Sequence, residues 1–227
     1  MLFWNMPIPE KHLAKFSEHG IYHVFNRTNN GELLFREDEN RYFFLKKFDV
    51  YLSRFLDTYA WCLLPNHFHL IVQVKSMEEI KATLQRTNPK EMTLTENRFL
   101  YGKNVKVAEL LEQTFKRFFQ CYALSFNKKY KRKGNLFYKP FKRIEINKES
   151  YFTQAIIYIH ANPLKHKIVD DFTAYKWSSW QSILSELPTS VMRKEVLDWF
   201  GGRNQFINVH KNMANYYYGG ENYSIET

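Results

Sequence analysis

The stretch LLPNHFHLIV, residues 63–72, places two histidines on either side of a phenylalanine inside an otherwise apolar run. The run predicts a buried strand, and a strand points successive side chains to opposite faces of its sheet. His67 and His69 therefore share one face with Ile71, while Phe68 belongs to a face that is wholly apolar. The two imidazoles lie roughly 6–7 Å apart at their Cα atoms, close enough to bind one ion. The alternative is a pair of strand histidines without function.

The segments around this strand predict an α+β fold. Hydrophobic periods of two and of three to four residues distinguish strands from helices. The order of elements fits a ferredoxin-like sandwich with a mainly antiparallel sheet and long helices. The predicted elements are a strand at 20–28, a helix at 37–56, strands at 58–64 and 67–74, a helix at 105–133 closed by Gly134, a strand or strand pair at 135–146 broken at Pro140, and a helix at 148–163.

The remaining segments predict less structure. Residues 75–104 are polar and form a connecting excursion with one short helix at 77–85. A short helix is expected at 193–201, followed by a marginally ordered aromatic tail at 215–226. The expected organisation is one domain at 1–182 and a helical C-terminal extension at 183–227.

The composition favours a polyanionic partner. The 227 residues carry a net charge of +10, and 18% of them are aromatic. Nucleic acid is the simplest such partner, although a merely basic soluble protein is the alternative. Cys62 and Cys121 stand in apolar contexts, which predicts thiols in a reducing compartment. The start, MLFWNMPIPEKH, has neither a signal sequence nor a membrane span, so a cytoplasmic protein without membrane contact is expected.

Tyr122 lies on the apolar stripe of the helix at 105–133. Periodicity alone makes it a core tyrosine. The same helix ends in NKKYKRK, however, and a tyrosine beside a cationic segment could attack phosphate. Its hydroxyl, with an ordinary pKa of about 10, would need a metal or a positive field for that role.

A basic and aromatic segment follows the same helix. Cations that bind phosphates, interleaved with rings that stack on bases, are typical of single-stranded nucleic-acid binding. The alternative is a solvated helix end. The candidate DNA-binding cations are Lys128, Lys129, Lys131, Arg132, Lys133, Lys139, Lys142 and Arg143, and the interleaved rings are Tyr130, Phe137, Tyr138 and Phe141.

Several blocks together resemble the REP-associated tyrosine transposases, a group of the single-tyrosine HUH transposases with an insertion-sequence-200-like domain. The blocks are LLPNHFHLIV, QCYALSFNKKYKRKGNLFYKPFK, YIHANPLKHKIV and YKWSSW, within residues 20–182. The resemblance implies metal-dependent cleavage and rejoining of single-stranded, hairpin-forming DNA. His67 and His69 would hold a divalent ion, Mg or Mn, and Tyr122 would form a 5′-phosphotyrosine link.

One departure leaves the third metal ligand open. Related transposases complete the metal site with a polar residue four positions after the tyrosine, but Phe126 stands there and cannot ligate. Asn127 and His23 are the candidates, and Tyr130 is the alternative nucleophile if Tyr122 is buried. Two other functions remain: a non-catalytic or domesticated nucleic-acid-binding protein of this fold, and a hydrolytic nuclease that uses only the histidines. A monomer and a homodimer are both compatible with the sequence.

Overall fold

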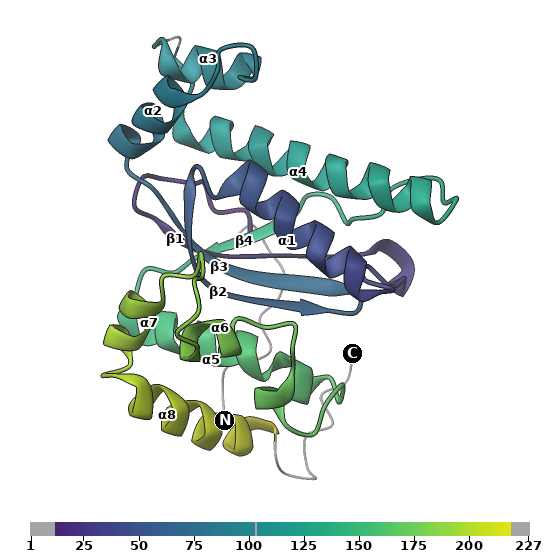
Figure 1. Cartoon of the computed structure of the whole chain (residues 1–227), viewed down its shortest axis with the longest axis vertical. Coiled ribbons are helices and arrows are strands. Elements are labelled where there is room, and N and C mark those ends of the chain that lie inside the picture. Colours follow the sequence, from purple (N-terminus) through teal and green to yellow (C-terminus); the bar gives the residue numbers. More distant parts are fainter. Residues whose placement is uncertain (1–11, 103, 219–227) are drawn as a thin grey trace.

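A four-stranded antiparallel sheet lies at the centre of the computed structural model, which describes residues 12–102 and 104–218 (Figure 1). Its strand order is β2-β3-β1-β4. The strands are β1 (Ile21–Arg27), β2 (Leu56–Leu64), β3 (His67–Val74) and β4 (Lys142–Glu145). The helices are α1 (Asp38–Leu52), α2 (Met77–Arg86), α3 (Leu94–Leu100), α4 (Val107–Lys129), α5 (Glu149–Lys165), α6 (Trp180–Leu184), α7 (Arg193–Trp199) and α8 (Arg203–Tyr218). The predicted α+β, ferredoxin-like arrangement is confirmed.

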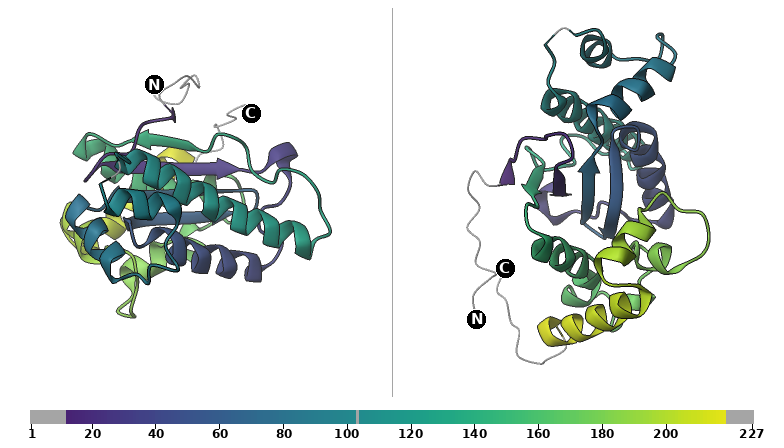
Figure 2. Two further views of the ribbon diagram at one scale, coloured as in Figure 1. Left: turned by 90° about the horizontal axis from the view of Figure 1, so that it is seen from above. Right: turned by 90° about the vertical axis from the view of Figure 1, so that its left-hand side faces the viewer.

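Helices cover both faces of the sheet. α1 and α4 lie on one face, and α5 to α8 lie on the other (Figures 1 and 2). β3 is a central strand with partners on both sides, which explains why its residues are nearly all buried. The Phe68 ring packs against Phe44 of α1 and Phe119 of α4, with ring centroids 4.9 and 5.8 Å apart. The α1–α4 layer therefore covers the Phe68 face, and α5 covers the histidine face.

The structure departs from the sequence-based predictions in the connections. Residues 75–104 contain a second helix, α3, whose start carries a capping box between Thr93 and Glu96. α4 ends at Lys129, and a left-handed Lys131 follows it before Gly134 is reached. The segment predicted as a strand or strand pair at 135–146 forms one short strand, β4, preceded by a single bridge between Thr28 and Phe137.

Further departures concern the C-terminal part. α5 continues through Pro163 and ends at Lys165, whereas the prediction ended it at Pro163. α8 was not predicted, and the tail beyond residue 218 lies outside the described residues. α8 packs on α5, so the predicted extension at 183–227 adds helices to the layer over the histidine face. The domain boundary at residue 182 stays a prediction.

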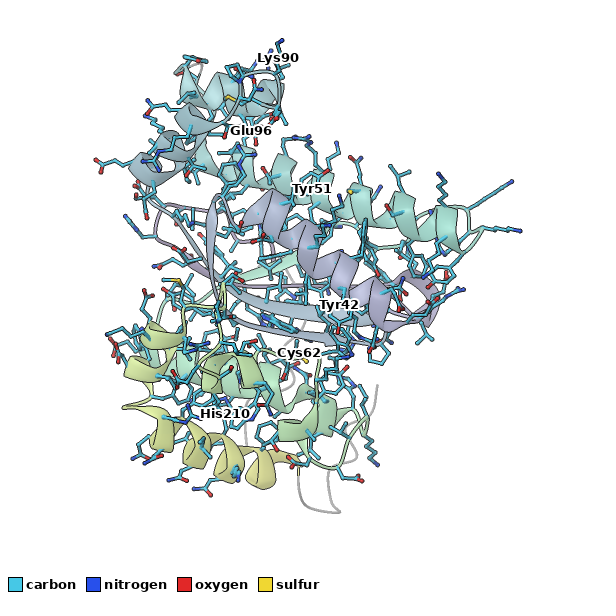
Figure 3. All side chains as sticks on the ribbon, viewed as in Figure 1. Tyr42, Tyr51, Cys62, Lys90, Glu96 and His210 are labelled. Atoms are coloured by element: carbon cyan, nitrogen blue, oxygen red, sulfur yellow. The ribbon has the colours of Figure 1, made fainter. Side chains whose placement is uncertain are left out.

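A buried hydrogen-bond relay fastens α5 to this extension. The Trp61 N–H of β2 donates to Ser179 Oγ at 2.9 Å, and His210 Nδ1 of α8 donates to the Phe206 carbonyl at 2.8 Å. These two end hydrogen bonds fix which atom donates and which accepts in the two hydrogen bonds between them. Ser179 Oγ donates to His160 Nε2 at 2.8 Å, and His160 Nδ1 donates to His210 Nε2 at 3.0 Å. Figure 3 labels His210 on the side of α8 that faces the sheet.

Burial keeps both imidazoles of the relay neutral. It lowers the pKa of His160 well below 6.5 and that of His210 to about 3. A neutral ring has one donor and one acceptor nitrogen, and the relay uses all four. The relay is therefore satisfied as it stands and joins β2, α5 and α8 without a buried charge.

Replacing His160 with leucine should lower the free energy of unfolding by about 2–4 kcal/mol, because it leaves the Ser179 hydroxyl hydrogen without an acceptor and His210 Nε2 without a donor in the buried interior. Urea denaturation would measure the loss. Gln154→Leu, at an exposed position of the same helix, is the matched control and should change stability by no more than about 0.5 kcal/mol. Equal effects of the two substitutions would contradict the role of the relay.

Candidate active site

The two histidines of β3 lie side by side on the face that α5 covers. His67 and His69 have ring centroids 5.1 Å apart. In the sheet, Phe25 of β1 stands opposite His69 and His23 stands opposite Ile71, so these side chains share the same face. The predicted neighbourhood of His23 and His69 is thus present, with His23 Nε2 at 2.9 Å from His69 Nδ1.

Each of the two imidazoles has its Nδ1 atom held by a neighbour. His67 Nδ1 donates to Asn66 Oδ1 at 2.6 Å, so its Nε2 carries the lone pair. His69 Nδ1 pairs with His23, and the tautomer in which His69 donates leaves its Nε2 lone pair as well. Such outer hydrogen bonds orient metal-binding histidines in proteins. They also make His23 an orienting partner of His69, because its own Nε2 is already used.

Burial keeps these histidines neutral. Burial, together with nearby His166, Lys165 and Arg27, lowers the pKa of His67 to about 3. It also lowers the pKa of His23 to about 3 and that of His69 well below 6.5. A neutral imidazole can bind a cation, whereas an imidazolium cannot. The pair is therefore in the protonation state that a metal site requires at neutral pH.

α5 brings Tyr158 and Asn162 to this face. The Tyr158 ring lies 5.7 Å from His69 and 6.1 Å from His23, centroid to centroid. Asn162 follows one turn later on the same side of the helix. It is fully buried, and its Oδ1 has no hydrogen-bond partner within the described residues, while its Nδ2 donates to the Tyr158 carbonyl. An unpaired buried oxygen is unfavourable for folding, which points to a ligand.

Basic side chains surround the same place, and burial with Lys165 lowers the pKa of one of them, His166. Lys165 Nζ lies 5.0 Å from the centre of the Tyr158 ring, and the His166 ring lies 5.0 Å from that of His67. Arg27, opposite His67 in the sheet, is exposed at the end of β1. Burial raises the pKa of Tyr158, and the Asn162 side chain offsets part of that rise. The arrangement suits the binding of a phosphate group.

Tyr122 lies on the other side of the sheet. It is 1% exposed, its hydroxyl donates to the Leu34 carbonyl at 2.7 Å, and its ring packs against Phe44 in the α1–α4 layer. Burial raises its pKa far above the ordinary value. The structure does not bring Tyr122 to the histidines, because the sheet separates them, and as placed it is a core tyrosine.

Two further predicted residues belong to the same distant layer. Asn127 Nδ2 donates to the Gly134 carbonyl, and its Oδ1 accepts from Arg132, so it fastens the loop after α4. Tyr130 donates to Glu37 at 2.7 Å, beside α1. Neither side chain approaches His67 or His69, and the geometry supports neither Asn127 as the third ligand nor Tyr130 as the nucleophile.

The sequence reasoning missed Tyr158 and Asn162, although the motif YIHANP was in view. A signal was present. The resemblance implies a polar residue four positions after the nucleophile, and Tyr158 with Asn162 has that spacing, whereas Tyr122 is followed by Phe126. The aromatic stripe of α4 favoured Tyr122, but such a stripe marks core residues.

The predicted DNA-binding cations divide into two groups. Arg132 is paired bidentately with Glu32, Arg143 is 6% exposed and paired with Glu112, and Lys129 is paired with Glu37. Lys142 of β4 is half-buried. The others are exposed and form no ion pair within the described parts of the chain: Lys128, Lys131, Lys133 and Lys139.

Within residues 12–102 and 104–218, no group of three or more His, Cys, Asp or Glu side chains has the arrangement of a metal site. A site at His67 and His69 would therefore need the amide oxygen of Asn162 as its third protein ligand. No helix in the same ranges is both long and apolar enough to cross a bilayer.

Comparison with known proteins identifies the fold. The chain is similar to the solved structure of a REP-associated tyrosine transposase bound to a REP hairpin, with a TM-score of 0.51 over 80% of this chain and 89% of that chain. The chain has the fold of a REP-associated tyrosine transposase. The two sequences are 16% identical, so the likeness is one of fold. No family model and no curated protein matches the sequence.

Replacing Asn162 with leucine, which has the same branched shape, should leave the free energy of unfolding unchanged within about 0.5 kcal/mol or raise it, because an unpaired buried oxygen is removed. Asn26→Leu is the matched control. Its amide donates to the Tyr138 carbonyl and accepts from the Arg27 N–H, so about 1–3 kcal/mol should be lost. Chemical denaturation in the presence of a chelator measures the free energy of unfolding of both variants. A loss at Asn162 as large as at Asn26 would make Asn162 a structural residue.

Proposed function

We propose that the chain cleaves and rejoins single-stranded DNA through Tyr158, with His67, His69 and Asn162 as ligands of a divalent ion. The observation that carries the proposal is the position of α5. This helix places a tyrosine and an unpaired amide oxygen over two neutral histidines. The Nδ1 atoms of both histidines already form hydrogen bonds with neighbouring side chains. The fold shared with a transposase supports this reading.

The donor set fits a hard or borderline ion. Two imidazole nitrogens and one amide oxygen leave coordination positions for phosphate oxygens, and Mn or Mg accepts such a mixture. A bound ion would polarise the scissile phosphate and neutralise charge on its oxygens. His23 and Asn66 hold the two rings in orientation, which is the second-layer support that metal-binding histidines need.

Tyr158 supplies the nucleophile. Its Oη forms a bond to the phosphorus while the bond from phosphorus to the 3′-oxygen breaks, and the phenol proton ends on the leaving 3′-OH. The product is a 5′-phosphotyrosine link, which keeps the phosphoester and allows a second 3′-OH to reverse the step without ATP. Burial raises the pKa of Tyr158, so the ammonium of Lys165 close to the ring assists by favouring the phenolate.

The substrate is single-stranded DNA that carries a hairpin. The transposase of the same fold was captured with a REP hairpin, and this chain has a net charge of +10 with exposed lysines along the 128–139 segment. Arg27 at the end of β1 presents a further cation beside His67. Arg27 attracts a phosphate backbone toward His67, and the exposed lysines add to the overall positive charge that attracts DNA to the protein.

Tyr158→Phe should abolish a covalent protein–DNA adduct with hairpin-bearing single-stranded DNA in Mn or Mg, because the attacking oxygen is removed. A denaturing gel shows the adduct and the cleaved strand. Tyr122→Phe is the matched control: it should keep full adduct formation, since its hydroxyl is bound to the Leu34 carbonyl across the sheet. Chelation of the metal should stop the reaction of the unaltered protein.

Other outcomes would redirect the assignment. An adduct that persists in Tyr158→Phe and disappears in Tyr122→Phe would return the nucleophile to the α1–α4 layer. Cleavage without any adduct would indicate a hydrolytic nuclease. Tight binding with neither cleavage nor adduct would leave a nucleic-acid-binding protein that has kept the fold.

The exposed lysines predict a salt dependence. For single strands, log affinity changes with log salt by roughly −0.7 per phosphate neutralised, so replacing Lys131, Lys133 and Lys139 together with alanine should flatten the slope by about 2. Titrations at four salt concentrations measure it. Lys194→Ala, a cation paired with Asp198 on α7, is the control and should leave the slope unchanged. Parallel lines for the triple variant would place the DNA path on another surface.

A further inference from the structure

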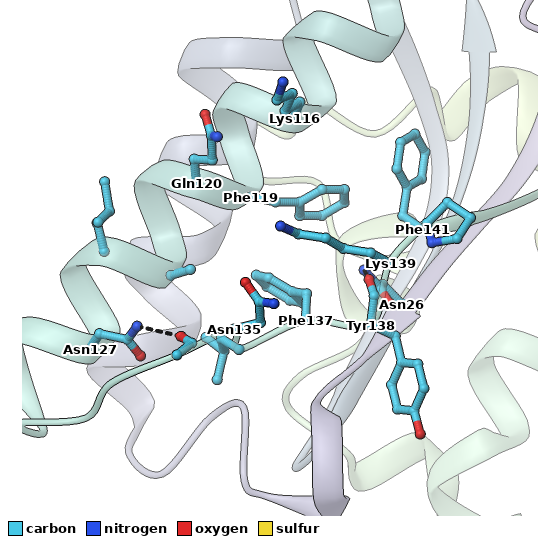
Figure 4. Close-up of a pocket in the computed structure, with 15 residues that line it drawn as sticks. Asn26, Lys116, Phe119, Gln120, Asn127, Asn135, Phe137, Tyr138, Lys139 and Phe141 are labelled. Atoms are coloured by element: carbon cyan, nitrogen blue, oxygen red, sulfur yellow. Dashed lines mark hydrogen bonds between the residues drawn. The ribbon is translucent and has the colours of Figure 1, made fainter.

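A cavity of about 580 Å³ lies outside the candidate active site, on the α4 side of the sheet (Figure 4). It lies between α4 and the segment 134–141 that leads into β4, and it is open to solvent. Its volume is in the range of small-molecule sites and exceeds that of one nucleobase. The proposed mechanism makes no use of it.

The floor of the cavity is aromatic. Phe119 of α4 packs against Phe137 and Phe141 of the opposite segment, with ring centroids 5.1 and 5.3 Å away. Ala123 and the exposed Leu124 continue the apolar lining toward the solvent. Flat rings beside a small side chain form a slot that suits another flat, weakly polar group.

The rim carries amides and positive charge. Gln120 and Asn135 are exposed at the rim, and their side chains make no hydrogen bond within the described residues. Lys116 stands on α4, and Lys139 extends between Phe119 and Phe137 in Figure 4. None of the residues that line the cavity is acidic. Free amides match the donor and acceptor edges of bases, and the lysines match a phosphate backbone.

The wall of the cavity also leads toward the candidate active site. Phe137 and Lys139 line the cavity, while Tyr138 between them points away from it (Figure 4). Arg27 lies over the Tyr138 ring at 4.8 Å, and Arg27 stands opposite His67 in the sheet. Tyr138 is 43% exposed, so this pair offers a cationic and aromatic surface between the cavity and the histidines.

We propose that this cavity binds an unpaired base of the DNA strand whose phosphate is held at His67 and His69. The DNA strand passes the end of β1 over Tyr138 and Arg27, and one base beyond the cleavage point enters the cavity to stack on Phe141 and to meet Gln120 and Asn135. The proposal rests on the proposed function only for the identity of the strand. It gives the protein a way to recognise sequence away from the reacting phosphate.

A scan of abasic sites along a hairpin-bearing oligonucleotide tests the proposal without any cleavage. The scan uses the full chain with Tyr158→Phe, in a chelator, and measures affinity by fluorescence anisotropy. Removal of one base, at one position only, should weaken binding about tenfold, because stacking on an aromatic surface is lost. 2-Aminopurine at that position should change its emission on binding.

Cavity variants connect the effect to this place. Ala123→Trp fills the slot. In this variant the oligonucleotide with the abasic site and the intact oligonucleotide should bind with equal affinity. Val50→Trp, at an exposed position of α1, is the matched control and should retain the tenfold difference. Gln120→Ala and Asn135→Ala change only exposed side chains, so they test the rim even if the filled variant does not fold. Each should reduce the preference for one base over the other three.

The outcomes separate this proposal from the proposed function. A flat abasic scan, with adduct formation at Tyr158 intact, would overturn the base site and leave the cleavage mechanism standing. The scan could show a loss of affinity at one abasic position, and this loss could disappear in Ala123→Trp. If the protein also never formed an adduct, these results would support the base site and overturn the mechanism. A change in sedimentation of the DNA-free protein caused by Ala123→Trp would assign the cavity to a contact between two copies and overturn the proposal.

Discussion

The alternation of side chains along β3 is the constraint on which the rest of the molecule depends. Because β3 is a central strand, each of its residues meets a layer of helices, and consecutive residues meet different layers. His69 meets α5, while Phe68 meets α1 and α4. A group can take part in chemistry at the histidines only if it belongs to the α5 layer or to the ends of the strands. This excludes every side chain of α4, the longest helix among the described residues.

The fold could be predicted from the sequence because its signals are local. Period-two runs marked β1, β2 and β3, and an apolar stripe marked α4, each close to its observed bounds. His67 and His69 could be assigned to one face for the same reason. α3 is an instance where a local signal was overlooked, since Thr93 and Glu96 have the spacing of a capping box.

The site could not be completed from the sequence, because its second half depends on which helix covers which face. Nothing in the period of α4 or α5 states on which side of the sheet each will lie. Tyr122 and Tyr158 both stand in apolar helical contexts. The polar residue four positions later marks Tyr158, but only the layer order places it at the histidines. Arg132 and Arg143 counted as free cations in the sequence, but their carboxylate partners, Glu32 and Glu112, are remote along the chain.

The hydrogen-bond relay through His160 has a consequence for how DNA strands could be exchanged. His160 sits on the back of α5, between Tyr158 and Asn162 in sequence, and it is joined to β2 through Ser179 and to α8 through His210. A helix fastened from behind to two other elements can neither slide nor rotate without breaking buried hydrogen bonds. A DNA end attached to Tyr158 would thus be anchored to the rigid part of the molecule. Any exchange of DNA strands would then depend on the mobility of the free 3′ ends. The protein would hold the 5′ end in place, and the nucleic acid would move.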